Sequence, residues 1–141
     1  MSNIVKDTHT YGGQKYNLGN KDKVAASAAT QAINTATVTQ ATNNATAVTI
    51  NAYAGVITTA GAAIANATNV EFLVNNNKVQ ADSVILVTTQ DENTTDNTCI
   101  VATINTVTAG SFKINLNHPD SVGTTSATAS KIHFLVINND G

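Results

Sequence analysis

Residues 109–117, Ala-Gly-Ser-Phe-Lys-Ile-Asn-Leu-Asn, alternate between polar and apolar side chains once past the opening Ala-Gly. Because successive side chains of a β-strand point to opposite faces, Phe112, Ile114 and Leu116 would form one apolar face and the residues between them a polar one. Such alternation is typical of a half-buried strand. An apolar strand face needs another apolar surface to cover it, so this stretch predicts a sheet that packs against a second layer.

The chain after residue 36 supplies further segments of the same kind. They are short and are separated by turn residues such as Asn and Gly, and Pro119 ends one of them because proline cannot donate to a strand ladder. Their regular spacing is typical of a sandwich or barrel. We predict an all-β domain over residues 37–141, an antiparallel β-sandwich of the jelly-roll kind. The candidate strands are residues 37–41, 47–51, 55–59, 69–75, 83–89, 98–107, 111–117 and 131–138.

The last candidate strand, residues 131–138, has two apolar faces. The set that begins with Ile132 would point into the core, while Leu135 and Ile137 make the opposite face apolar as well. Such a strand is either central between two covered faces or turned toward a partner chain. Closed cyclic symmetry would bury the second face, and we assign His133, Leu135 and Ile137 to an oligomer interface.

The first 36 residues differ in kind from the rest. Their apolar residues are too sparse to form a face in either the helical or the strand period, so we interpret them as an extended N-terminal arm and linker that cannot order itself by its own burial. Residues 22–33 are alanine-rich and start with an N-cap candidate, so both a short helix and an extended linker remain open. Docking to a partner best explains the apolar residues of the arm. The proposed docking residues are Ile4, Val5, Tyr11, Tyr16 and Leu18.

Composition argues against nucleic acid and membranes as partners. All seven basic residues are lysines and the formal net charge is −2, whereas nucleic-acid binding favours a clustered basic face with arginine. No stretch has the apolar length needed to span a bilayer, and no signal-peptide hydrophobic region follows the N-terminus. The 23 threonines, 19 asparagines and 21 alanines suit turn-rich β-structure with neutral surfaces that pack against other protein.

The sequence carries no recognisable catalytic or cofactor-binding motif of the zincin, CxxC, Walker or dinucleotide type. His118 and Asp120 could form half of a metal or acid/base site, but a strand-ending turn explains them equally well. The acidic loop at residues 91–97 has enough oxygen ligands for weak calcium binding, although a solvated hairpin tip is the simpler interpretation. Cys99 is expected to be a buried apolar strand residue. We therefore predict no enzymatic activity, no cofactor and no metal.

The succession of strand motifs resembles a known group of proteins. The motifs are Val48-Thr-Ile-Asn, Ala54-Gly-Val-Ile-Thr-Thr, Val70-Glu-Phe-Leu-Val-Asn-Asn, Ser83-Val-Ile-Leu-Val, Ala109-Gly-Ser-Phe-Lys-Ile-Asn-Leu-Asn and Ile132-His-Phe-Leu-Val-Ile. Together they resemble small β-rich structural proteins of tailed bacteriophages, a group that includes capsid decoration (cement) proteins and parts of head or tail fibres. The resemblance covers about residues 38–138, and the arm does not match in detail.

The resemblance implies a structural role in the virion. As a decoration protein made in the host cytoplasm, the chain would bind the outer surface of the major capsid protein lattice as a homotrimer and stabilise the assembled shell. The arm would anchor it by adding a strand to a neighbour. The alternative is a head- or tail-fibre module that binds a host receptor or glycan, for which a chain with no tryptophan and three tyrosines is poorly equipped. Neither role involves nucleic acid or a membrane.

Overall fold

The computed structural model divides the chain into two units, Met1–Asn34 and Thr35–Gly141. The residues that it describes are 8–11, 14–17, 35–65, 67–90, 100–118 and 129–138. All helices and strands assigned in this part of the chain are β-strands. This part contains no helix that is long and apolar enough to cross a membrane. Residues 22–33, for which a helix and an extended linker were both open, lie outside the described residues.

The first unit contains a hairpin that the sequence analysis missed. Strands β1 (Thr8–Tyr11) and β2 (Gln14–Asn17) pair antiparallel, with Tyr11 opposite Gln14. The two residues between them are both glycine, and a Gly-Gly pair is a signal for a two-residue hairpin turn because glycine accepts the positive φ that such turns require. The turn chemistry therefore predicts an element that the sparse apolar residues did not.

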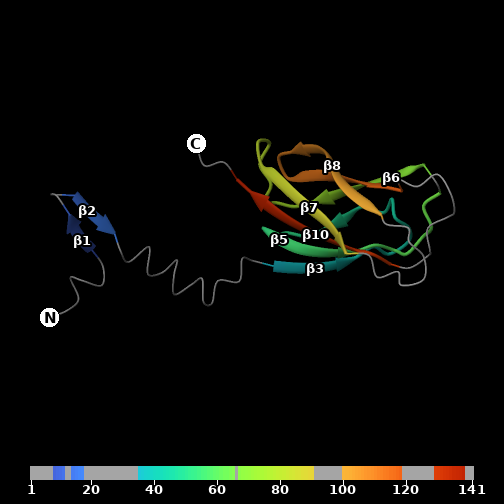
Figure 1. The fold of residues 1–141 in the computed structure, drawn as a ribbon, viewed down its shortest axis with the longest axis horizontal. Coiled ribbons are helices and arrows are strands. Elements are labelled where there is room, and N and C mark those ends of the chain that lie inside the picture. The colour runs from blue at the N-terminus through green and yellow to red at the C-terminus, as the bar shows by residue number, and fades with distance from the viewer. Residues whose placement is uncertain are drawn as a thin grey trace. The chain divides into compact units, whose positions relative to one another are not determined.

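The second unit consists of two four-stranded sheets, drawn in Figure 1. Its strands are β3 (Thr35–Thr39), β4 (Val48–Thr49), β5 (Ala54–Thr58), β6 (Asn69–Asn75), β7 (Val84–Gln90), β8 (Val101–Thr108), β9 (Ser111–Asn117) and β10 (Lys131–Ile137). Sheet I has the order β3-β5-β10-β7, and sheet II has the order β4-β6-β9-β8. From β3 to β8, consecutive strands therefore alternate between the two sheets. The all-β prediction is confirmed for the described residues.

The predicted strands all appear, but the antiparallel assignment is only partly right. β6 and β9 have the predicted bounds, whereas β4 is reduced to two residues. β3 pairs parallel with β5, and β4 pairs parallel with β6, so both sheets are mixed. Parallel neighbours need a crossover connection. Here each connection includes a strand of the opposite sheet: in chain order β4 comes between β3 and β5, and β5 comes between β4 and β6. Spacing along the sequence does not reveal such a crossover.

The two sheets pack face to face in a sandwich-like arrangement. The alternation that predicted β9 is observed directly, because Phe112, Ile114 and Leu116 are buried while their neighbours are partly exposed. From the other sheet Ile132 and Phe134 enter the same apolar cluster, and the rings of Phe112 and Phe134 meet with centroids 5.7 Å apart. Each such side chain contributes roughly 1.5–3 kcal/mol when fully buried, so the core is the main source of stability.

Buried amide side chains hold the loops at both ends of the sandwich. Asn76 donates from Nδ2 to the Ala52 carbonyl at 2.7 Å and accepts at Oδ1 from the Lys78 amide at 3.0 Å. Gln40 donates from Nε2 to the Thr46 carbonyl at 2.8 Å. These bonds satisfy backbone groups that no strand ladder reaches, which gives the abundant amide residues a structural use.

Candidate interaction surface

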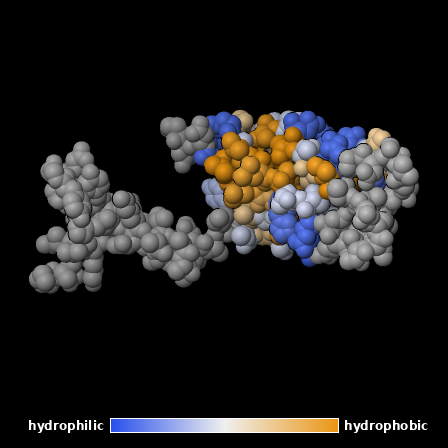
Figure 2. Space-filling view, in the orientation of Figure 1, coloured by the Kyte–Doolittle hydropathy of each residue, from blue (hydrophilic) through white to orange (hydrophobic). Residues whose placement is uncertain are grey.

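The outer face of sheet I carries an apolar patch. Leu86 of β7 lies opposite Leu135 of β10, and Val84 lies opposite Ile137. Val84, Leu86 and Ile137 are 54%, 53% and 46% exposed, although apolar side chains of this size are usually buried in a core. Figure 2 shows apolar residues gathered on this side of the molecule, over β7 and β10. These residues, Val84, Leu86, Leu135 and Ile137, are called the apolar patch below.

The other half of the same face is polar but almost uncharged. His133 lies between Val56 and Thr88, and its Nε2 is 2.9 Å from Oε1 of Gln90. Lys131 is the only Asp, Glu, Lys or Arg in the four strands of sheet I. A partner that covers this face would therefore bury little charge.

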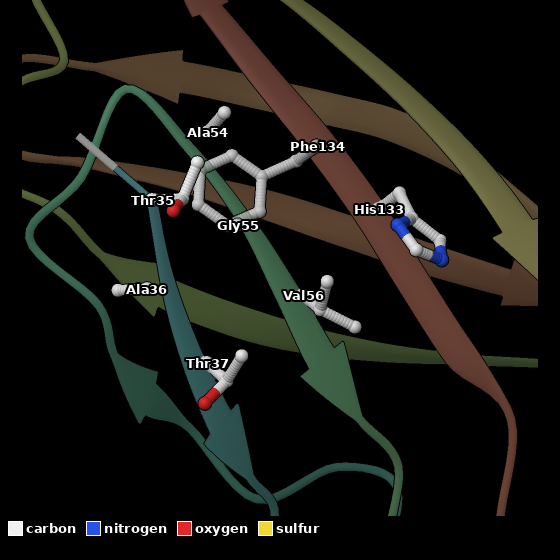
Figure 3. Close-up of a pocket in the computed structure, with 8 residues that line it drawn as sticks. All are labelled: Thr35, Ala36, Thr37, Ala54, Gly55, Val56, His133 and Phe134. Carbon is white, nitrogen blue, oxygen red and sulfur yellow. The ribbon is translucent and has the colours of Figure 1, made fainter. Parts of the chain in front are cut away.

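Two shallow hollows flank His133 on this face, and Figure 3 shows the larger one. The larger, of about 410 Å³, is bordered by threonines of β3 and by Ala54 and Val56 of β5. The smaller, of about 210 Å³, is bordered by Leu86 and Leu135 of the apolar patch. The surface is therefore ridged along β10 rather than flat, and a partner needs a complementary shape to fill it.

A glycine fixes the floor of the larger hollow. A Cβ atom at Gly55 would lie 2.8 Å from Cε1 of Phe134 and 2.7 Å from the carbonyl oxygen of Ala36. Both distances are shorter than ordinary van der Waals contacts, so no larger residue fits without a shift of the core or of β3. The position is therefore occupied by glycine for packing and not for a turn.

The outer face of sheet II has the opposite character. Lys113 of β9 donates from Nζ to Glu71 of β6 at 2.7 Å, and Asn105 of β8 also donates to the Glu71 carboxylate. The hydrogen bond from Lys113, aided by that from Asn105, lowers the pKa of Glu71 below its ordinary value. Asn69 and Asn115 bond across the strands at 2.8 Å, and Val101 is the exposed large apolar residue of this face. Several of the polar side chains on this surface are therefore already hydrogen-bonded to side chains of neighbouring strands.

The described residues contain no cluster of three or more His, Cys, Asp or Glu side chains able to hold a metal ion. His118 directly follows β9 and is buried, and its backbone amide donates to the Thr68 carbonyl at 3.0 Å. Asp120, its suggested partner, lies outside the described residues, as do the acidic loop at 91–97 and Cys99.

The predicted interface residues His133, Leu135 and Ile137 lie at alternate positions of β10 and share the outer face of sheet I. Of the predicted arm residues, Tyr11 and Tyr16 lie in the β1–β2 hairpin. Ile4, Val5 and Leu18 lie outside the described residues. Their roles in binding remain predictions.

β7 also contributes to this surface, although it was not among the predicted interface residues. Residues 83–87, Ser-Val-Ile-Leu-Val, form a nearly continuous apolar run, as residues 132–137 do. Two apolar faces on one strand predicted an interface for β10, and the same argument applied to β7 would have found Val84 and Leu86.

Comparisons of the chain with protein-family models, with curated proteins and with solved structures find no match.

Proposed function

We propose that this protein is a non-enzymatic structural component of a tailed-phage particle, and that it acts by adhesion through the outer face of sheet I. The observation that supports this proposal most strongly is the asymmetry between the two outer faces. Leu86 and its neighbours expose apolar surface on sheet I, whereas paired polar side chains such as Glu71 and Lys113 cover sheet II. An apolar patch on one face of a protein is typical of an interaction site.

The size of the patch limits what it can do alone. Covering each half-exposed side chain, such as Val84, Leu86 or Ile137, would contribute about 1 kcal/mol. Association costs roughly 4–15 kcal/mol in lost translational and rotational freedom. The patch is therefore too small for tight binding by a single copy, and several linked contacts are needed to raise the overall affinity.

The specific role that we propose is capsid decoration. The chain would assemble into homotrimers on the outer surface of the major capsid protein lattice, where the outer face of sheet I, with His133, Leu135 and Ile137, becomes buried between subunits. The N-terminal segment would be the arm that anchors each subunit to the capsid, and the three arms of a trimer supply the several linked contacts that the patch alone lacks. This proposal derives from the resemblance of the strand motifs. It includes a jelly-roll connection of the strands, the N-terminal arm and the location on the virion.

Replacing Leu86 with Glu tests the proposal, because a carboxylate on the apolar patch would have to lose its hydration when the face is covered. We expect L86E to fold normally, since the side chain is half exposed, and to lose at least about tenfold in binding to purified phage particles measured by co-sedimentation. The matched control is Val101→Glu, which places the same charge on the outer face of sheet II and should bind like the wild type.

Equal binding by both variants would contradict the proposed contact face. Binding of the isolated protein to a glycan array, with no binding to capsids, would instead support the fibre-module alternative.

A further inference from the structure

Within the part of the chain that the structure describes, one of the four edge strands of the two sheets lacks the features that normally prevent pairing with another chain. In sheet II, β4 has only two residues, and β8 has a register shift between Ile104 and Thr106 of the kind a β-bulge produces. In sheet I, the β7 edge lies beside β8, because the Ala102 amide donates to Oγ1 of Thr89 at 3.0 Å. β3 has five residues with no charge, proline or bulge. Short strands, bulges and charges are the usual protections of an edge, and β3 has none of these.

The hydrogen-bonding direction of β3 follows from its parallel pairing with β5. The Gln40 amide donates to the Thr58 carbonyl at 2.9 Å, and residues two apart along a strand bond to the same neighbour. Ala36 and Val38 therefore bond toward β5, while the N–H and C=O groups of the three threonines point away from β5. Within the described residues these outward backbone groups have no hydrogen-bond partner. The threonines are Thr35, Thr37 and Thr39.

We propose that two copies of this chain pair antiparallel through β3, with a two-fold axis at Thr37. The strand reads Thr-Ala-Thr-Val-Thr, which is nearly the same in both directions. Around this axis Thr37 lies opposite its own copy, and Thr35 lies opposite Thr39 of the second copy. These are the residues whose backbone groups point outward, so each opposed pair exchanges two hydrogen bonds as an antiparallel ladder requires.

The side chains fit the same arrangement. Thr–Thr pairs across an antiparallel ladder are favourable, and the uncharged strand brings no like charges together at the axis. Ala36 would lie opposite Val38 of the second copy on the inner side, where both residues already pack against the core and would gain cover. A self-complementary surface of this kind is what a two-fold interface needs.

The contact would join two copies of sheet I into one eight-stranded sheet, with both apolar patches on the same side. A five-residue strand pair buries less than the roughly 800 Å² per partner of a stable interface, so the dimer is weak in solution and becomes stronger where copies are held side by side. This pairing uses the edge and not the face of sheet I. It therefore holds or fails independently of the proposed function.

Thr37→Pro tests the pairing without breaking the sheet. Proline removes the Thr37 N–H, which points away from β5, and edge strands accept proline at such positions. We expect the full-length T37P chain to keep its far-UV circular dichroism and most of its thermal stability. Sedimentation velocity between about 10 µM and 1 mM should show weak self-association for the wild type and none for T37P.

Val38→Pro is the matched control, because it removes an N–H that bonds to β5 and should therefore lower the melting temperature. Equal self-association of T37P and the wild type, or a wild type that stays monomeric over the whole range, would overturn the proposal. A T37P variant that self-associates normally but loses binding to a different protein would also overturn the proposal, because that protein and not a second copy would then be the partner of β3.

Disulfide trapping provides a second measurement. In a Cys99→Ser background, Thr37→Cys places two thiols at the axis, where the Cα atoms of a hydrogen-bonded pair lie about 5.5 Å apart, within the range that a disulfide spans. Mild oxidation should give covalent dimers of this variant. Thr103→Cys, exposed on sheet II, should stay monomeric. Failure of the Thr37→Cys variant to cross-link more than the Thr103→Cys variant would contradict the two-fold pairing.

Discussion

Single amide side chains decide how the loops of this protein are held. Asn76 is buried and bonds both the Ala52 carbonyl and the Lys78 amide, while its own backbone amide donates to the Gly110 carbonyl at 2.8 Å. One residue thereby connects the turn after β6, the β4–β5 loop and the turn before β9. The left-handed φ of +85° at Gly110 allows that last turn, since glycine adopts it without a Cβ clash.

Replacing Asn76 with Ala should destabilise the fold by about 1–3 kcal/mol, because it leaves a buried carbonyl and a partly buried amide without their bonds. Urea unfolding followed by circular dichroism measures this. Asn77→Ala is the matched control, since Asn77 is exposed and should change the free energy of unfolding by less than about 0.5 kcal/mol. Similar losses in both variants would show that the buried bonds of Asn76 do not stabilise the loops.

At the scale of strands, period-two alternation was sufficient to find the elements of the second unit. β6 and β9 follow from it with their bounds because each has one clearly apolar face. The two parallel pairs did not follow, since pairing direction depends on how the chain crosses between layers and not on any one segment. Half of the candidate site was predictable from β10. Val84 and Leu86 were missed because residues 83–89 were predicted only as a strand, and neither of its faces was assigned to a surface.

The link between β6 and β9 on sheet II gives a pH prediction. The Glu71 pKa is lowered in the folded state, so the pair with Lys113 stabilises the fold above the unfolded pKa of Glu and this contribution is lost as the pH falls through the folded pKa. Glu71→Gln should remove it. We therefore expect the melting-temperature difference between wild type and E71Q to shrink as the pH falls from neutral into the acid range below the ordinary Glu pKa.

The contribution is small because both side chains are partly exposed and water screens them. In high salt the difference should shrink at neutral pH as well. A melting-temperature difference that stays constant with pH would show that Glu71 titrates alike in the folded and unfolded states.

At the scale of the whole molecule, the two outer faces of the sandwich-like second unit differ. Polar side chains on one face bond to one another, whereas the other face exposes apolar side chains. Sheet II is covered by cross-strand polar pairs such as Asn69 with Asn115, whereas sheet I exposes Leu86 and Ile137 around a nearly uncharged ridge. Because removing apolar surface from water is favourable, covering this face with another protein surface lowers the free energy. Adhesion through sheet I is the central claim that joins the fold to the proposed role.

Hydroxyl-radical footprinting of the protein bound to phage particles tests that claim most directly. We expect labelling of Leu86 and Ile137 to fall strongly on binding while labelling of Val101, exposed on sheet II, stays unchanged. Protection of Val101 with unaltered labelling of Leu86 and Ile137 would contradict the account.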